Sequence, residues 1–205
     1  MIEKPAITDQ KIDKTLAERW SGRAFDPTTQ VSDDTIVSLC EAARWAPSCF
    51  GDQPWRFIVW NKFQDKVSWQ KAIDTLSPGN QDWAKNAPLL ILAASVKTFS
   101  HNGSNNRWVG YDSGAASISL CLQATSMGLM SHQMGGFDGD KVRAEFSLPD
   151  DIELWAMISV GYPAGLDGLN EEQLERELKA RERRPLSEQF FSGEWNSPLN
   201  SGEQK

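Results

Sequence analysis

The chain has 205 residues, of which 40% are hydrophobic and 24% charged, the composition of one ordinary globular domain. The formal net charge of −7 argues against nucleic acid and against an anionic membrane surface as partners. Three widely spaced cysteines suggest no disulfide framework, and with two histidines the sequence predicts no metal site. We expect Cys40 and Cys121 in the core. The first residues contain no apolar leader, which favours a cytoplasmic location.

In the first half of the chain, apolar spacing and cap residues predict alternating helices and strands. Ser32 is a candidate N-cap, and the continuous apolar run from Leu89 to Ser95 indicates a strand that is buried on both faces. The predicted helices span residues 8–19, 32–45, 63–76 and 81–86. The predicted strands span residues 55–60 and 89–95.

In the second half, a polar loop over 97–106 leads into a long helix over about 107–127, closed by Gly128. Its polar residues mark it as a buried helix rather than a membrane span. Its small residues suit the centre of the fold or a dimer contact. A short helix over 140–146, a strand over 153–162 and a helix over 171–184 complete an α+β pattern with long helices on a small sheet.

Two clusters of arginines suggest an anion site. Arg19, Ser21 and Arg23 offer two guanidiniums and a hydroxyl within five residues, which suits a phosphate, although a solvated helix end would have the same composition. The second cluster is Arg181, Arg183 and Arg184. The sequence leaves open whether the fold brings the two clusters together.

Two loops are candidate ligand walls. Ala46 to Trp55 is a stiff, proline-rich segment that carries Ser48, Cys49 and Gln53, and the alternative is a plain turn between helix and strand. No basic neighbour in the sequence activates Cys49, so a catalytic thiol is disfavoured. The run Met134-Gly135-Gly136-Phe137 allows a backbone to approach a flat ligand, or is a simple turn.

Several familiar motifs are missing from the sequence. It contains no Gly-x-Gly, so the dinucleotide-binding fingerprint is absent, and no Walker A, His-Glu-x-x-His or Gly-x-Ser-x-Gly run occurs. A nucleophilic triad would have to use His101 or His132, and neither has suggestive neighbours in the sequence.

Taken in chain order, the motifs form a recognisable series. Its members are Arg19-Trp20-Ser21-x-Arg23-x-Phe25, Ala43-x-x-Ala46-Pro47-Ser48 with Gln53-Pro54-Trp55, Gly79-Asn80-x-x-Trp83-x-x-x-Ala87-Pro88, Asp112-x-Gly114-x-Ala116, Gly135-Gly136-Phe137-Asp138, Gly161-Tyr162-Pro163 and Arg183-Arg184-Pro185-Leu186. In this order and spacing the series resembles the FMN-dependent nitroreductase family over nearly the whole chain.

The resemblance implies one nitroreductase-like domain over 1–205, with extended or loose tails at about 1–7 and 196–205. It implies a three-layer α+β fold, in which a small, mostly antiparallel sheet lies between helices and a long central helix lies at a homodimer interface. Two FMN sites are implied at that interface, each built from both chains.

The resemblance also implies roles for individual residues. Arg19, Ser21 and Arg23 would bind the FMN phosphate with Trp20 contributing backbone, and Arg181 or Arg183, or else Arg184, would complete that site. Pro47, Ser48 and Cys49 would lie against the flavin ring of the other protomer's site. Asn80 would contact the flavin or its ribityl chain. Met134, Gly135 and Gly136 would run beside the ring with a backbone N–H toward N5, so no side chain need be catalytic.

The chain departs from the family pattern at two glycines. Gly51 stands where Asn is common, and the lost contact to the cofactor passes to Asp52 or Gln53. Gly135 stands where Glu is frequent, which alters the nicotinamide side of the pocket. Both departures bear on the substrate more than on FMN.

The implied activity is ping-pong hydride transfer from NADH or NADPH, through FMN, to an electron-poor acceptor such as a nitroaromatic or a quinone. Two alternatives remain open at the level of sequence: a flavin-binding or flavin-sensing module with little turnover, and a protein without flavin in which every motif is structural.

Overall fold

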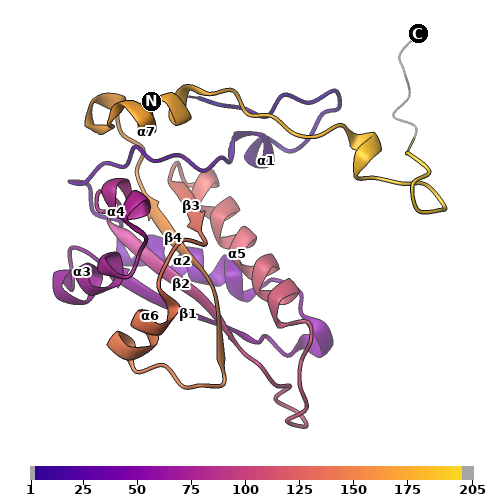
Figure 1. The fold of residues 1–205 in the computed structure, drawn as a ribbon, viewed down its shortest axis with the longest axis horizontal. Helices are drawn as coiled ribbons and strands as arrows, with labels where there is room; N and C mark the ends of the chain where they lie inside the picture. The colour runs from indigo at the N-terminus through magenta and orange to yellow at the C-terminus, as the bar shows by residue number, and fades with distance from the viewer. Residues whose placement is uncertain (1–2, 200–205) are drawn as a thin grey trace.

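The computed structural model describes residues 3–199, which fold as three layers with the sheet in the middle (Figure 1). Strands β1 (Trp55–Asn61), β2 (Leu89–Val96), β3 (Met130–Met134) and β4 (Ile152–Gly161) form the sheet in the order β1-β2-β4-β3. Every neighbouring pair of strands is antiparallel. The α+β class and the small antiparallel sheet predicted from the sequence are confirmed.

Strand β2 is buried on both faces, as its apolar run predicts. On one face, alternate residues from Leu89 to Ala93 pack with α2 (Asp33–Arg44) and α5 (Val109–Ser126). On the other face, alternate residues from Leu90 to Ala94 pack in a second core. That core includes residues of α3 (Lys66–Asp74), α4 (Pro78–Ala84) and α6 (Gly139–Phe146). Alternation along one strand therefore joins both outer layers.

The two terminal helices are shorter than predicted. Helix α1 covers Lys14–Glu18 rather than 8–19, because the Asp13 side chain accepts the Thr15 N–H (2.8 Å) and starts the helix there. Helix α7 covers Glu171–Leu178 rather than 171–184. The Lys4 ammonium donates to the carbonyl oxygens of Glu177 and Lys179, so the N-terminal segment supplies the partners at the end of this helix.

Strand β3 was not predicted, because Met-Ser-His-Gln-Met contains no β-branched residue and follows directly on a long helix. Its pairing with β4, from Met130 opposite Gly161 to Met134 opposite Met157, makes it a strand. The expectation for the cysteines is half right, since Cys121 is buried and Cys40 is exposed.

The N-terminal segment at Lys4 packs beside the segment that follows α7. Lys4 and Ala6 are hydrogen-bonded to the body, whereas residues 1–2 and 200–205 of the expected tails lie outside the described residues. Beyond α7 the chain extends away from the sheet layers (Figure 1) and includes the short 3₁₀ turn η3 (Leu186–Glu188). Within residues 3–199, no helix is long and apolar enough to cross a membrane, and no group of three metal-ligating side chains occurs.

Candidate functional site

The fold brings the two arginine clusters of the sequence into one cavity. The cavity has a volume of about 270 Å³, and seven of its eleven lining residues are Lys or Arg while one is Glu. The lining consists of Lys4, Arg19, Trp20, Ser21, Arg23, Arg176, Lys179, Ala180, Arg181, Glu182 and Arg183. Arg184 does not line it. A concentrated positive cavity on a chain with a net charge of −7 suits a small anion.

Within this cavity, Arg181 and Arg183 have different surroundings. The Arg181 guanidinium donates through Nη1 to the carbonyl oxygens of Lys4 and Ala17 (2.8 Å for Ala17) and through Nη2 to that of Arg19 (3.1 Å). Burial, and then the positive charges of Arg19 and Arg183, lower its pKa. Arg183 is exposed and donates through Nη1 to the Glu182 carbonyl oxygen (2.8 Å). Arg181 therefore ties the chain ends together, and Arg183 is free to reach an anion.

The loop that carries Arg23 rests on aromatic side chains. His132 of β3 shares a hydrogen bond with the Gly22 carbonyl through Nδ1 (3.0 Å), so Nδ1 is the protonated ring nitrogen. The His132 ring lies 4.5 Å from the ring of Trp83, and the Arg23 guanidinium lies 5.9 Å from the same indole. A Cβ at Gly22 would lie 2.2 Å from Met130 Sδ, so any larger residue there would have to displace that side chain. The structure thus connects the arginine loop to β3.

The buried imidazole of His132 predicts a pH dependence. Burial, with smaller contributions from Arg23 and Arg19, lowers its pKa from 6.5 to about 4. The unfolded chain therefore takes up this proton as the pH falls below about 6.5, whereas the folded chain does not until about pH 4. We expect this group to lower the free energy of unfolding by about 3 kcal/mol as the pH falls from about 6.5 to about 4.

Urea unfolding at several pH values tests this expectation. The control is His132→Phe, which keeps a ring beside Trp83 and has no proton to bind. The wild type is expected to lose about 3 kcal/mol more than the variant on going from pH 7 to pH 4. Equal losses in the two proteins would show that His132 does not titrate as described.

At the far end of β3, Asn80 and the double glycine meet. Asn80 of α4 donates through Nδ2 to the Gly136 carbonyl (3.0 Å), which also accepts the Ser77 N–H (2.9 Å). A Cβ at Gly136 would lie 2.8 Å from Ser77 Oγ, whereas one at Gly135 would meet nothing within 4 Å. The Met134 side chain is buried in the core, so this stretch offers its backbone to a ligand rather than side chains.

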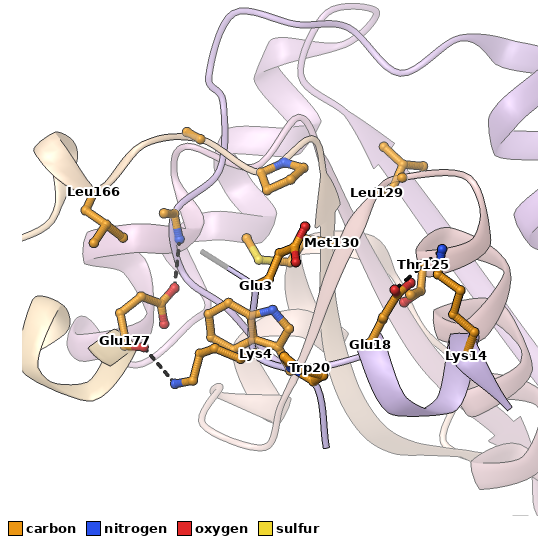
Figure 2. A pocket seen from close by; sticks show the side chains of 15 residues that line it. Glu3, Lys4, Lys14, Glu18, Trp20, Thr125, Leu129, Met130, Leu166 and Glu177 are labelled. Carbon is orange, nitrogen blue, oxygen red and sulfur yellow. Dashed lines mark hydrogen bonds and ion pairs between the residues drawn. The ribbon is translucent and has the colours of Figure 1, made fainter. Parts of the chain in front are cut away.

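The loop from Pro47 to Gln53, the candidate wall for a ligand, packs against the start of α5. The Cys49 N–H donates to Asp112 Oδ2 (3.1 Å) in the first turn of α5, and the Gln53 N–H donates to Ser48 Oγ (3.0 Å). Trp20, which lines the arginine cavity, also lines a second cavity of about 390 Å³ together with Thr125 (Figure 2). Thr125 lies in the last turn of α5, at the opposite end from Asp112. Eighteen helical residues span about 27 Å. One chain therefore does not bring this loop to the arginine cavity.

The backbone of this loop accounts for Gly51. Phe50, Gly51 and Gln53 have φ of 55°, 67° and 50°, and η1 covers Cys49–Gly51. Gly and Asn are the residues that adopt this left-handed conformation most easily, so Gly51 keeps the backbone that Asn would have. Asp52 is not free to replace that side chain, because its Oδ1 accepts the Ser100 N–H (2.8 Å) and hydroxyl (2.6 Å).

Three residues near the cavity were missed in the sequence as parts of a site: His132, Trp83 and Glu177. The sequence gives His132 no suggestive neighbour because its partners, Gly22 and Trp83, are distant along the chain. A signal existed only for Trp83, which is one of the motif residues that carry the family resemblance.

Comparisons with known proteins agree with this fold. The model of the nitroreductase family matches residues 16–162. A crystal structure described as an oxidoreductase containing FMN is 33% identical and superposes with a TM-score of 0.87, covering 93% of this chain and 96% of that one. A nitroreductase family protein from Clostridium difficile 630 is 28% identical, with a TM-score of 0.66 and coverages of 86% and 95%.

A relative from Archaeoglobus fulgidus is provisionally named an NADH dehydrogenase/NAD(P)H nitroreductase. It is 27% identical over 154 residues, which is 73% of this chain and 84% of the relative. The family match covers well over half of the chain and includes all four strands and residues 19–23, while the cluster at 181–183 lies beyond it. This protein belongs to the nitroreductase family.

Proposed function

We propose that this protein is an FMN-dependent oxidoreductase. The observation that carries the proposal is the cavity in which residues 19–23 and 181–183 meet, with one acidic residue among eleven. A phosphate monoester carries about −1.5 to −2 charges and three acceptor oxygens, which suit guanidinium and hydroxyl donors. Arg19, Ser21, Arg23 and Arg183 would hold the phosphate, while Arg181 fixes the two segments to each other.

The other end of the cofactor would lie along β3 toward the double glycine. Gly135 is open, and the Gly136 backbone is fixed by Ser77 and Asn80, so a flat ring can approach the main chain there. The buried Met134 anchors the turn in the core. These residues would orient the ring, and the backbone N–H groups of the turn would be available to it as donors.

A second copy of the chain would complete the site. The loop at Cys49 is bonded to the first turn of α5, whereas Trp20 of the arginine cavity lies near Thr125 in the last turn, so the wall over the ring would come from the partner's Pro47, Ser48, Cys49 and Gln53. Tyr111 and Ile118 of α5 are exposed, and a Cβ at Gly114 between them would meet nothing within 4 Å. An exposed apolar stripe with a gap for close approach suits a homodimer interface.

When bound, FMN would supply the redox chemistry, accepting hydride from NADH or NADPH and returning it to an electron-poor acceptor such as a nitroaromatic or a quinone in a ping-pong sequence. The chain's own residues bind the phosphate, orient the ring and cover it. The relatives described as containing FMN and as NAD(P)H nitroreductases support this assignment.

The visible spectrum of the purified protein is the most direct test. We expect a yellow protein with about one FMN per chain and the mass of a dimer of the 22.9 kDa chain. Anaerobic addition of NADH or NADPH should bleach the colour, and a quinone should restore it. A colourless protein that FMN cannot reconstitute would contradict the proposal, whereas a yellow protein that neither nucleotide bleaches would be a flavin-binding module without turnover.

A further inference from the structure

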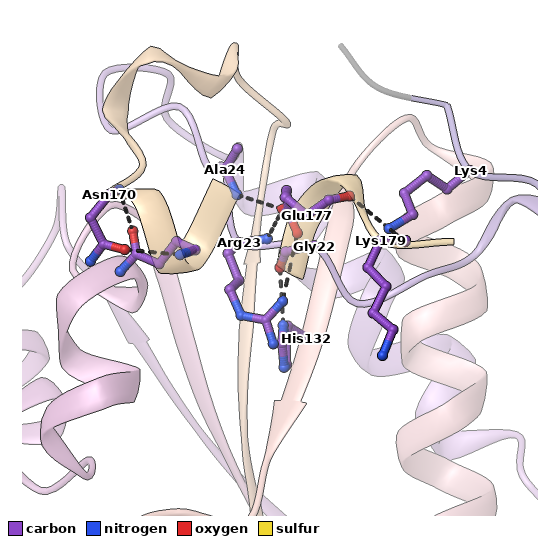
Figure 3. A network of polar contacts seen from close by, with 9 residues as sticks. Lys4, Gly22, Arg23, Ala24, His132, Asn170, Glu177 and Lys179 are labelled. Atoms are coloured by element: carbon purple, nitrogen blue, oxygen red, sulfur yellow. Dashed lines mark hydrogen bonds and ion pairs between the residues drawn. The ribbon is translucent and has the colours of Figure 1, made fainter. Parts of the chain in front are cut away.

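Glu177 is a buried carboxylate directly behind the arginine loop. It is 1% exposed and lies in the last turn of α7. Its Oε1 accepts the backbone N–H groups of Arg23 and Ala24 (3.2 Å for Ala24), and its Oε2 lies 3.6 Å from Arg23 Nη1 (Figure 3). One carboxylate therefore holds both the backbone and the side chain of Arg23.

A carboxylate in this position is costly and needs its partners. Removing an ionised group from water costs several kcal/mol unless hydrogen bonds and an opposite charge offset it. Oε2 has no hydrogen-bond donor among the described residues, and the Arg23 guanidinium, 3.6 Å away, is the charge paired with it. Conversely, the Glu177 carboxylate is packed in the interior, so its charge restrains the position of the Arg23 guanidinium.

The loop is held from its other side as well. The Gly22 carbonyl is bonded to His132, and the next two backbone N–H groups are bonded to Glu177. The Arg23 side chain, 20% exposed, then has its Trp83 contact and its ion pair on the protein side and the cavity on the other. The loop is thereby fixed before any anion arrives.

We propose that Glu177 is the positioning residue of the anion site: it fixes the backbone at Arg23 and Ala24 and aims the Arg23 guanidinium at the cofactor's phosphate. The inference rests on the proposed FMN site. Glu177 acts through Arg23 and does not touch the cofactor. Its contribution should therefore concern the phosphate and leave the ring end of the cofactor unaffected.

The substitution Glu177→Gln separates this role from a merely structural one. Glutamine has one acceptor oxygen, so either its amide N–H₂ faces the Arg23 and Ala24 N–H groups or it faces the guanidinium. Both arrangements oppose donor to donor and release Arg23. Glu175→Gln is the matched control, because it removes the same charge from an exposed position of the same helix.

The measurement is the Kd of the apoprotein for FMN and for riboflavin, which has the same ring and ribityl chain without the phosphate. We expect E177Q to raise the Kd for FMN at least tenfold and to change that for riboflavin less than twofold, with both values unchanged in E175Q. In an Arg23→Ala background, E177Q should have no further effect on the ratio of the two constants.

Two results would overturn the inference. One is an unchanged ratio of the two constants, whether both rise equally or neither changes, and the other is tighter FMN binding by E177Q, which would make the carboxylate a competitor of the phosphate. Should E177Q not fold, Glu177→Asp keeps the charge on a side chain too short to hold both partners, and the same loss of preference is expected. If the wild type binds neither ligand, the proposed function fails. If it binds FMN and the ratio stays constant, this inference alone fails.

Discussion

Replacing both Arg19 and Arg23 by alanine is expected to weaken FMN binding by about a hundredfold to ten-thousandfold. The two side chains line the cavity with Ser21, which Arg19 Nη1 approaches to 3.4 Å. A hydrogen bond to a charged group contributes about 1.5–3 kcal/mol, so two lost guanidiniums remove about 3–6 kcal/mol. The measurement is the Kd for FMN from flavin fluorescence during titration of the apoprotein.

Two comparisons make this result specific. Lys66→Ala with Lys85→Ala removes two positive charges from exposed positions that do not line the cavity, and FMN affinity should then be unchanged. Riboflavin, which lacks the phosphate, should bind the Arg19/Arg23 variant nearly as it binds the wild type. Normal FMN occupancy in the double variant would remove the basis for placing the phosphate here.

Replacing Trp83 by alanine is expected to lower the free energy of unfolding by about 3–5 kcal/mol, the usual cost of truncating a buried Trp. Trp83 is 2% exposed and stacks on Phe25 with ring centroids 6.1 Å apart. Its ring also lies 4.5 Å from the His132 ring and 5.9 Å from the Arg23 guanidinium. The variant should therefore lose both core packing and the platform beneath the anion site.

Urea unfolding of the apoprotein measures this loss without stabilisation by bound cofactor. Val67→Ala, at an exposed position of α3, should change the stability by no more than about 0.5 kcal/mol. A loss below about 1 kcal/mol in Trp83→Ala would mean that the surrounding side chains collapse into the space, and that the indole is not the support described here.

Much of the fold followed from local patterns. The apolar run of β2 required burial on both faces, and that alone places helices on two sides of a sheet. Ser32 begins α2 as predicted, since its Oγ accepts the Thr35 N–H (3.2 Å). Prediction was wrong where a partner distant in sequence decides the conformation: β3 forms because β4 pairs with it, and α7 ends where Lys4 supplies the donor.

The candidate site divides in the same way. The sequence was enough to select the arginines and the serine as phosphate-binding candidates, because guanidiniums close to a hydroxyl suit a phosphate in any fold. The sequence could not distinguish Arg181 from Arg183, because their hydrogen bonds depend on which carbonyl oxygens the fold places within reach. The reason for Gly51 was also hidden until its φ of 67° was known.

By itself, the sequence determined the fold class, the family resemblance and the residues that suit a phosphate, because helix periods, caps and residue chemistry are local properties. Only the tertiary structure decided that residues 19–23 and 181–183 share one cavity, that a buried Glu177 stands behind Arg23, and that the loop at Cys49 lies at the other end of α5. These outcomes depend on contacts between segments up to about 160 residues apart, and packing rather than local propensity selects such contacts.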